Sequence, residues 1–209
     1  MRILPVIPDR VFIRDGLDDR GQRGSVVWGG RSPDIIVMRK ADADPIAQAT
    51  ADNNTTGPFA NLNDARRGDR VRQGDNTIFV RVHNRGAITI NSEVRLFRVP
   101  LASITNGAAW TAIGAPTQVT GIAARTWKTA RIQLPAVPAD PEPTLPAPWG
   151  KAFVLAALVR ARNPAGGAEL ESFPDVTTVT GVDELWTLFT RGALGNNAAF
   201  RALRFLGGP

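Results

Sequence analysis

The chain has 209 residues, of which 43% are hydrophobic and 21% charged, a composition that suits a globular protein with a substantial core and excludes disorder throughout. It contains no cysteine, no tyrosine and a single histidine, which excludes disulfide scaffolds, thiolate zinc sites and multi-histidine metal sites. A catalytic triad would have to be built around His83, and this argues against most enzyme classes.

The net charge of +6, from 25 basic and 19 acidic residues, raises the question of a nucleic-acid partner. The densest basic stretch, residues 66–72, is interrupted by Asp69 and flanked by Asp64 and Asp75. No run of interleaved basic and aromatic residues accompanies it, as a surface that stacks bases would require. We therefore expect a solvated, charged loop at this stretch and no nucleic-acid binding.

The sequence contains no apolar run of about 18 residues, so no membrane-spanning helix is predicted. Its first residues lack the charged head and apolar stretch of a signal peptide. We therefore expect a chain that stays in the cytoplasm or is exported without a cleaved leader.

Residues 1–31 are rich in Asp, Arg, Gly and Pro, with a short apolar run at residues 11–13. This composition predicts an extended arm that contributes one strand, followed by a sandwich domain over residues 32–209. Short apolar runs on a polar, proline-punctuated chain suit strand addition to the sheet of a neighbouring molecule. The alternative is an arm that covers the edge of its own domain.

Most of the predicted elements in the domain are short strands. Apolar or alternating runs predict them at residues 35–38, 76–86, 93–99, 110–113, 125–134 and 153–159. The last of these runs is apolar on both faces, so we expect it at the centre of the core. The polar residues 41–76 and the six prolines within 135–148 predict two surface connections.

The clearest strand covers residues 76–86, because its polar and apolar residues alternate. The alternate apolar residues from Ile78 to Val82 would face the core, whereas Arg81 and His83 would face solvent. The pattern is typical of a half-buried strand, and the sequence Asn-Arg-Gly that ends it is typical of a turn.

Only one helix is predicted, over residues 183–191, where Asp183 would cap the first turn. The tail at residues 196–205 fits either a helix or a strand. Many short strands, turns rich in Pro and Gly, and little helix together predict an all-β antiparallel sandwich.

Residues 75–86, followed by residues 94–97, resemble the opening strands of immunoglobulin-like bacterial modules, in particular the cell-adhesion-related domain in bacteria (CARDB). Residues 153–159 are similar to a late core strand, residues 196–201 to an asparagine-led closing strand, and residues 32–35 to the entering segment. The resemblance implies an immunoglobulin-like sandwich whose tail is a strand. It implies a binding or assembly role without catalytic residues, and it names no ligand.

Asp15, Asp18 and Asp19, with Asp34 beyond them, are candidate calcium ligands because calcium prefers oxygen donors. Their spacing does not match the twelve-residue calcium loop, and interleaved arginines lower the local negative charge. We favour a plain acidic turn, here and at residues 42–44, and predict neither a metal nor a cofactor.

Four residues are candidates for contact with a partner, namely Trp28, Arg67, Asp69 and Trp149. Arg67 and Asp69 flank Gly68 in the tripeptide that integrin ligands use, although a solvated turn explains this arginine-rich stretch better. The two tryptophans lie beside glycine or proline and are expected to be exposed, whereas Trp127 lies in a patterned segment and is expected to be buried.

The predicted function is that of a non-enzymatic structural or protein-interaction module in a larger assembly, such as a particle, a secretion apparatus or a surface layer. Its partner would be another protein or further copies of the chain. The alternative is a carbohydrate-binding or adhesive module of a bacterial surface or secreted system, in which exposed tryptophans would stack on sugars. An enzyme is the least favoured class, because His83 has no evident histidine or serine partner and is expected to be a surface polar residue.

Overall fold

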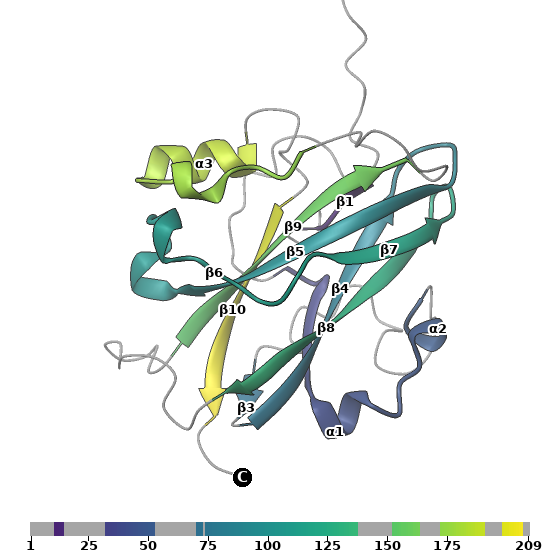
Figure 1. Ribbon diagram of the computed structural model, residues 1–209, viewed down its shortest axis with the longest axis horizontal. Helices are drawn as coiled ribbons and strands as arrows, with labels where there is room; N and C mark the ends of the chain where they lie inside the picture. Colours follow the sequence, from purple (N-terminus) through teal and green to yellow (C-terminus); the bar gives the residue numbers. More distant parts are fainter. Residues whose placement is uncertain are drawn as a thin grey trace, which may run out of the picture.

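The computed structural model describes residues 11–14, 32–52, 70–72, 74–137, 152–163, 172–190 and 198–206, which are mostly β-strand (Figure 1). The strands are β1 (Val11–Phe12), β2 (Ile35–Arg39), β3 (Arg70–Arg72), β4 (Gly74–Asn84), β5 (Ile90–Pro100), β6 (Thr111–Ala112), β7 (Thr117–Ile122), β8 (Trp127–Val137), β9 (Ala152–Arg162) and β10 (Ala198–Leu206). The helices are α1 (Lys40–Ala43), α2 (Gln48–Ala51) and α3 (Val182–Thr190), with short 3-10 turns η2 (Leu101–Ser103), η3 (Gly107–Ala109) and η4 (Val176–Thr178). None of the helices in these ranges has the length and hydropathy needed to span a membrane.

The strands form two sheets that pack face to face. In the first sheet β4 lies in the middle, with β8 along one side, and with β2 opposite residues 76–80 and β1 opposite residues 83–84 on the other. The second sheet has the order β3-β10-β9-β5-β6, and β7 also pairs with β5. All pairs are antiparallel except β3 and β10, which run parallel. The predicted all-β sandwich is confirmed.

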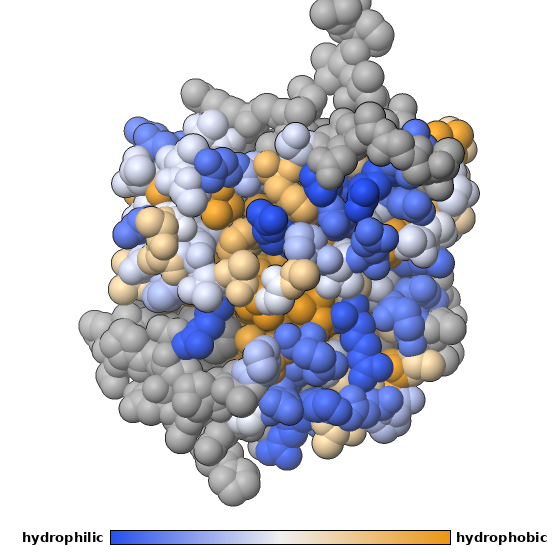
Figure 2. All heavy atoms as spheres, in the orientation of Figure 1, coloured by the Kyte–Doolittle hydropathy of each residue, from blue (hydrophilic) through white to orange (hydrophobic). Residues whose placement is uncertain are grey.

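The main core lies between the two sheets, where alternate residues of facing strands meet. Ile78, Val80 and Val82 of β4 point into it as predicted, and meet the layer that contains Leu96 of β5 and Leu155 of β9; all five are at most 1% exposed. Apolar side chains are not confined to this space. On the face shown in Figure 2 they lie across the middle of the surface, between polar side chains.

The outer face of the first sheet is covered by α1 and α2, whose apolar side chains pack against Ile36, Phe79 and Trp127. On the outward face of β4, Phe79 and Arg81 are 0% and 1% exposed. The prediction of a half-buried strand was therefore wrong for β4, which is buried on both faces. Alternation shows which residues share a face of a strand, but it does not show whether that face meets solvent or another segment.

The outer face of the second sheet is covered by η3, η4 and α3. Trp110 packs edge-to-face on Phe97 and Phe200, with ring centroids 6.0 and 5.6 Å apart, and Leu185 of α3 joins the same cluster. Residues 154–159 of β9 are consequently buried on both faces. This confirms the prediction, made from its unbroken apolar run, that this strand lies at the centre of the fold.

The connections differ most from the predictions. Polar residues 41–76 include α2 and β3 as well as most of α1, and β7 was not predicted because its sequence, rich in Thr with Gln and Gly, has no apolar run. The helix near the C-terminus begins at Val182, so Asp183 lies in its first turn rather than at its cap. The tail is strand β10, as the family resemblance implied.

The proline-rich connection begins later than predicted, because β8 continues through Pro135 to Val137. Proline cannot donate a hydrogen bond to a neighbouring strand, and it is tolerated in strands at bulges. The register between β4 and β8 shifts at this point, from Asn76 opposite Leu134 to Gly74 opposite Val137, with Gly74 at a φ of 88°. The bulge thus accommodates the proline.

Gly107 lies where two of the covering turns meet, since its backbone N–H donates to the carbonyl of Val179, just after η4, at 2.7 Å. A Cβ at this position would lie 1.7 Å from the backbone oxygen of Val176. We expect Gly107→Ala to push η4 away from η3 and to lower the free energy of unfolding by about 1–3 kcal/mol, as overpacking does. Urea denaturation would measure the change. The neighbouring exposed variant Ala108→Ser should stay within about 0.5 kcal/mol of the parent, and equal stability of the two variants would contradict the close contact.

Candidate functional site

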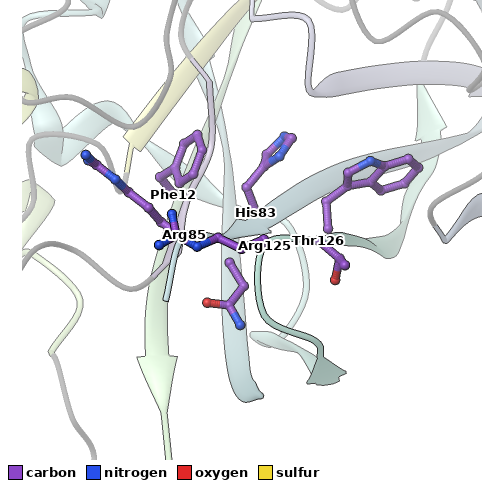
Figure 3. Close-up of a pocket in the computed structure, with 7 residues that line it drawn as sticks. Phe12, His83, Arg85, Arg125 and Thr126 are labelled. Carbon is purple, nitrogen blue, oxygen red and sulfur yellow. The ribbon is translucent and has the colours of Figure 1, made fainter. Parts of the chain in front are cut away.

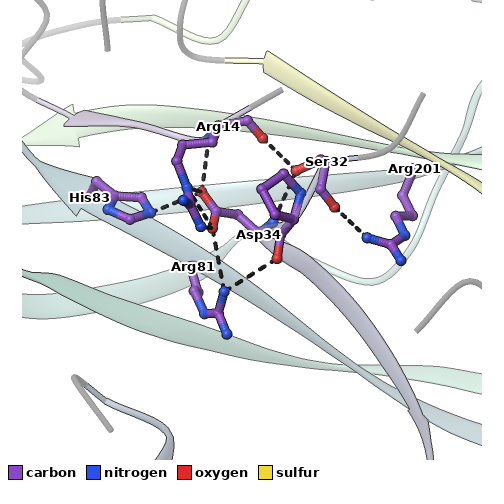
Figure 4. A network of polar contacts seen from close by, with 7 residues as sticks. Arg14, Ser32, Asp34, Arg81, His83 and Arg201 are labelled. Carbon is purple, nitrogen blue, oxygen red and sulfur yellow. Dashed lines mark hydrogen bonds and ion pairs between the residues drawn. The ribbon is translucent and has the colours of Figure 1, made fainter. Parts of the chain in front are cut away.

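A buried carboxylate, Asp34, organises the outer face of the first sheet at the end where β1 lies (Figure 4). Arg14 donates to it from Nη2 and Nε, at 2.7 Å to Oδ1 and 3.0 Å to Oδ2. His83 Nε2 lies 2.9 Å from Oδ2, and Arg81 Nη1 forms an ion pair with Oδ1 at 3.6 Å. We call these four residues the Asp34 network.

The strand register brings the network together. Asp34 precedes β2, and its carbonyl accepts from the backbone N–H of Arg81 at 2.9 Å, so its side chain lies on the face that carries Arg81 and His83. Ser32 Oγ donates to the Arg14 carbonyl at 2.5 Å and accepts from the Asp34 N–H at 3.2 Å. Arg201 of β10 donates to the Ser32 carbonyl at 2.6 Å, which ties the network to the second sheet.

The network determines the protonation state of Asp34. Burial raises the pKa of this carboxyl, but the positive charge and hydrogen bond of His83, together with the hydrogen bonds and charge of Arg14, outweigh burial and hold the pKa well below its ordinary value. Asp34 is therefore ionised throughout the neutral and mildly acidic range. A carboxylate that is already paired with Arg14 and Arg81 is a poor ligand for calcium, so the geometry favours the interpretation without calcium.

The structure also corrects the expectation for His83, whose side chain is only 14% exposed. It is held between the Asp34 carboxylate and the ring of Phe12, which stacks on it with a centroid distance of 4.9 Å and an interplanar angle of 23°. His83 is thus a part of the Asp34 network rather than a surface polar residue.

The predicted arm is described only over residues 11–14. Here β1 pairs with β4 of its own chain, Val11 and Ile13 are 0% exposed in the main core, and Arg14 binds Asp34. Strand addition to a neighbouring molecule is therefore contradicted for these four residues, which cover the edge of their own sheet. The division between arm and domain after residue 31 stays a prediction for the rest of the segment, which lies outside the described residues.

Beside the network lies a pocket of about 360 Å³ (Figure 3). Its seven lining residues come from β1, from the end of β4 and the turn after it, and from the start of β8 and the turn before it. The lining residues are Phe12, His83, Asn84, Arg85, Arg125, Thr126 and Trp127. None of the seven is acidic, and two carry guanidinium groups. Phe12 and Trp127 are 8% exposed and form the apolar walls of the pocket. The pocket therefore combines positive charge with apolar surface.

Asn84 fixes the two turns that carry the arginines. Its side-chain oxygen accepts from the Gly86 N–H at 2.8 Å, which closes the turn after β4 that the sequence predicted. Its amide nitrogen donates to the carbonyls of Ile88, at 2.8 Å, and of Ile122 and Ala123, at 2.9 and 3.2 Å, across the second turn. A single buried side chain thus holds both rims of the pocket.

Arg125 occupies the left-handed region of backbone space, with a φ of 61°. The neighbouring Thr126 donates two hydrogen bonds to the Ala123 carbonyl, from its backbone N–H at 3.2 Å and from its hydroxyl at 2.8 Å. A non-glycine residue at positive φ is uncommon and costs about 1–3 kcal/mol, and such positions cluster at functional sites. The sequence does not predict this positive φ, because arginine has no preference for the left-handed region.

The pair of His83 and Asp34 has the geometry that orients a catalytic imidazole, in which a carboxylate holds one ring nitrogen. A hydrolytic triad also needs a hydroxyl on the other nitrogen. Within the described ranges no serine or threonine bonds to His83: Thr126 Oγ1 is directed to Ala123, and Ser32 Oγ to Arg14. The described residues therefore supply an oriented imidazole without a nucleophile.

The remaining predicted site residues are distributed as follows. The calcium candidates Asp15, Asp18 and Asp19, and the interaction candidates Trp28, Arg67, Asp69 and Trp149, lie outside the described residues. Asp44 forms ion pairs with Lys40 and, at 2.9 Å, with Arg131. One of the two carboxylates that a calcium site at residues 42–44 would use is therefore already paired. In the part of the chain that the structure describes, no group of three or more potential metal ligands occurs.

The segment with α1 and α2 also protects an open sheet edge. Thr129 of β8 points its backbone N–H and carbonyl away from β4, because it lies opposite Arg81, whose own N–H bonds Asp34 on the far side. Asp52 accepts from the Thr129 N–H at 2.9 Å, and the Gln48 amide donates to the Thr129 carbonyl. Two side chains thus replace a neighbouring strand at the point where the edge would be open to pairing.

We expect the double variant Gln48→Ala and Asp52→Ala to lose about 1–3 kcal/mol, because it leaves partly buried backbone groups unsatisfied. It should also associate at high protein concentration through the exposed edge. Light scattering over a concentration series would measure the association. The control variant Gln118→Ala and Asp42→Ala removes the same two groups from exposed positions and should remain like the parent. Equal behaviour of both variants would show that the edge needs no cover.

Comparisons with known proteins give fold neighbours only. No protein-family model matches the chain, and no curated protein matches it. Among solved structures, it is similar to the CARDB domain of a Pyrococcus furiosus protein in complex with di-metal ions, with 15% identity and a TM-score of 0.35 over 67% of this chain and 86% of that chain. It is also similar to AsqI with zinc, with 10% identity and a TM-score of 0.46, over 95% of this chain but 40% of that one.

A third similar structure is a crustacean hemolymph-type prophenoloxidase, with 12% identity and a TM-score of 0.35 over 65% of this chain and 25% of that chain. At such identities the likeness concerns the fold, and no activity follows from it. The chain is an all-β sandwich, and a CARDB domain, from the family that its sequence motifs resemble, is among its structural neighbours.

Proposed function

We propose that this chain is a non-enzymatic β-sandwich module that binds a protein partner, or further copies of itself, within a larger assembly. The observation that carries the proposal is that the ionisable groups at the β1 end of the first sheet are of two kinds, buried and paired or exposed beside a pocket. Arg14 and His83 are both bound to Asp34 in the Asp34 network, whereas Arg125 is exposed beside an open pocket. The residues of the Asp34 network stabilise the fold from its interior, whereas the exposed charge of Arg125 on a turn is placed to contact a partner.

Trp110 and Trp127 support protein recognition over the carbohydrate alternative. Sugar binding needs an aromatic face open to solvent. Trp110 is 7% exposed and enclosed by Phe97 and Phe200, and Trp127 is 8% exposed with the Arg81 guanidinium 5.3 Å from its ring centroid. Neither offers a whole face on which a sugar ring could stack, although Trp127 contributes to the wall of the pocket. A titration of tryptophan fluorescence against a glycan panel would return the carbohydrate alternative to first place if quenching saturated at micromolar glycan.

The test of the proposal combines affinity capture with reconstitution. The full chain should retain a stoichiometric partner from the native organism, and the purified pair should bind again, or the chain alone should assemble as its concentration is raised. A Leu155→Asp variant, whose core is disrupted, serves as the control for non-specific adsorption. A chain that stays monomeric and binds no purified partner, or a catalytic turnover abolished by His83→Asn, would contradict the proposal.

A further inference from the structure

We infer that the pocket lined by Phe12, His83, Arg85, Arg125 and Trp127 binds the carboxylate of an acidic protein segment, with an apolar group of the same segment packed beside it. The inference rests on the proposed function, because it names the chemistry by which the module would recognise a protein. It goes further in committing to one site and one class of ligand group.

The first argument is charge. Two guanidinium groups, those of Arg85 and Arg125, line the pocket, and no lining residue is acidic. The carboxylate of Asp34, which contacts the lining residue His83, is itself paired with Arg14. Guanidinium groups present a planar fork of N–H donors that matches the two oxygens of a carboxylate. An anionic group is therefore the complement of this pocket.

The second argument is the apolar surface. Phe12 stacks on the His83 ring, and Trp127 packs in the outer cluster of the first sheet, so both aromatic walls are fixed before any ligand arrives. Walls and rims that are already ordered lose little conformational freedom on binding. A ligand that carries only charge would leave these walls without a contact. A carboxylate joined to a hydrocarbon group would use both the arginines and the walls.

The third argument is Arg125 itself. It is exposed, stands at a φ of 61°, and forms no ion pair or hydrogen bond of its side chain with any residue in the described ranges. Glycine would adopt this backbone conformation without strain, so arginine at this position carries a conformational cost. Contact between the Arg125 guanidinium and a ligand would account for an arginine at this strained position.

The size of the pocket selects the kind of ligand. A volume of about 360 Å³ is at the lower end of the range for small-ligand sites, roughly 300–1,000 Å³, and accommodates a side chain or a chain terminus. The two arginines lie on two turns and line one pocket. A nucleic-acid strand requires a basic stripe that follows several phosphates. A protein carboxylate is therefore the better match.

The test uses NMR of the full, isotope-labelled chain with a minimal probe. The probe is 3-phenylpropionate, which joins one carboxylate to one aromatic ring, and its matched controls are neutral 3-phenylpropionamide and phenyl phosphate. We expect 3-phenylpropionate to shift the backbone amides of residues 85–86 and 125–127, with saturation at millimolar concentration. The amide should bind at least tenfold more weakly. Equal affinity of acid and amide, or tighter binding of phenyl phosphate, would overturn the inference.

The matched variants are Arg125→Gly and Arg39→Gln, each of which removes one positive charge. Glycine suits the positive φ of Arg125, so this variant should fold, while Arg39 is exposed at the opposite end of the strand pair formed by β2 and β4. We expect Arg125→Gly to weaken 3-phenylpropionate at least fivefold and Arg39→Gln to leave its affinity unchanged. Equal losses in both variants would reveal a general charge effect and overturn the inference.

Two peptide arms identify the source of the carboxylate. One peptide has an internal Glu beside Phe and an amidated end, and the other has a free C-terminal Phe and no acidic side chain. Binding of either that is lost in Arg125→Gly supports the inference and names the source; binding of neither overturns it. The probes test binding at the pocket alone, so a negative result would not contradict binding of a reconstituted protein partner elsewhere on the chain. Only a failure of reconstitution would contradict the proposed function.

Discussion

Replacing Asp34 by asparagine is expected to lower the free energy of unfolding by about 3–5 kcal/mol, because it removes the only carboxylate in the network and leaves Arg14 and Arg81 buried beside a neutral amide. The effect is large because the cations remain buried, not because the ion pairs contribute much by themselves. Urea or guanidinium denaturation followed by tryptophan fluorescence would measure it.

A control variant, Asp42→Asn, makes the same chemical change at an exposed position of α1 and should change stability by less than about 0.5 kcal/mol. Losses of similar size in both variants would show that the Asp34 network is not a major source of stability.

The pH dependence of stability gives a second readout of Asp34. Its pKa is lowered in the folded state, whereas in the unfolded chain it returns to about 3.9. As the pH falls, the unfolded state therefore binds the proton first, and this stabilising contribution is present above about pH 4–5 and is lost progressively below that range. The parent chain should lose stability more steeply below about pH 5 than Asp34→Asn. Parallel curves for the two proteins would contradict the lowered pKa.

Replacing Leu155 by aspartate is expected to unfold the domain. Leu155 is 0% exposed in the main core, and its strand β9 is paired along both edges, by β5 and β10. An unpaired carboxylate at this position costs several kcal/mol beyond the lost apolar contact, which is comparable to the stability of an ordinary domain, about 5–15 kcal/mol. Circular dichroism and the melting temperature would report the loss.

Leu155→Met is the matched control, since it conserves volume and hydrophobicity and should cost less than about 1.5 kcal/mol. A folded Leu155→Asp protein with the melting temperature of the parent would show that residues 153–159 do not form the core.

The strands that are most regular in sequence were predicted well. Residues of β4, β5, β8 and β9 alternate or form unbroken apolar runs, and these local patterns depend only on the period of two that every strand imposes. The tail is different, because its pattern fits a helix as well as a strand, and the family resemblance decided it. The strand β7 was missed, since its Thr and Gly residues pair along β5 without any apolar pattern of their own.

The candidate site was less accessible to prediction. His83 was found because it is the only histidine, yet its partner Asp34 is 49 positions away, and Arg14 lies 20 positions before Asp34. Trp127 lies opposite His83 only because of the register between β4 and β8. Arg85 lies in the Asn-Arg-Gly turn that the sequence predicts, whereas Arg125 carries no sequence signal, because its left-handed backbone is imposed by the turn.

The sequence by itself determined that the chain builds an all-β sandwich, and which side chains of its central strands point into the core. These properties follow from local periodicity, which each strand carries in its own residues. Only the tertiary structure decided that α1 and α2 cover the outer face of β4, that Arg14 and His83 enclose Asp34, and that two turns hold arginines around one pocket. The physical reason is that covering, pairing and register join segments distant in sequence, and their free energy arises from contacts that no single segment contains.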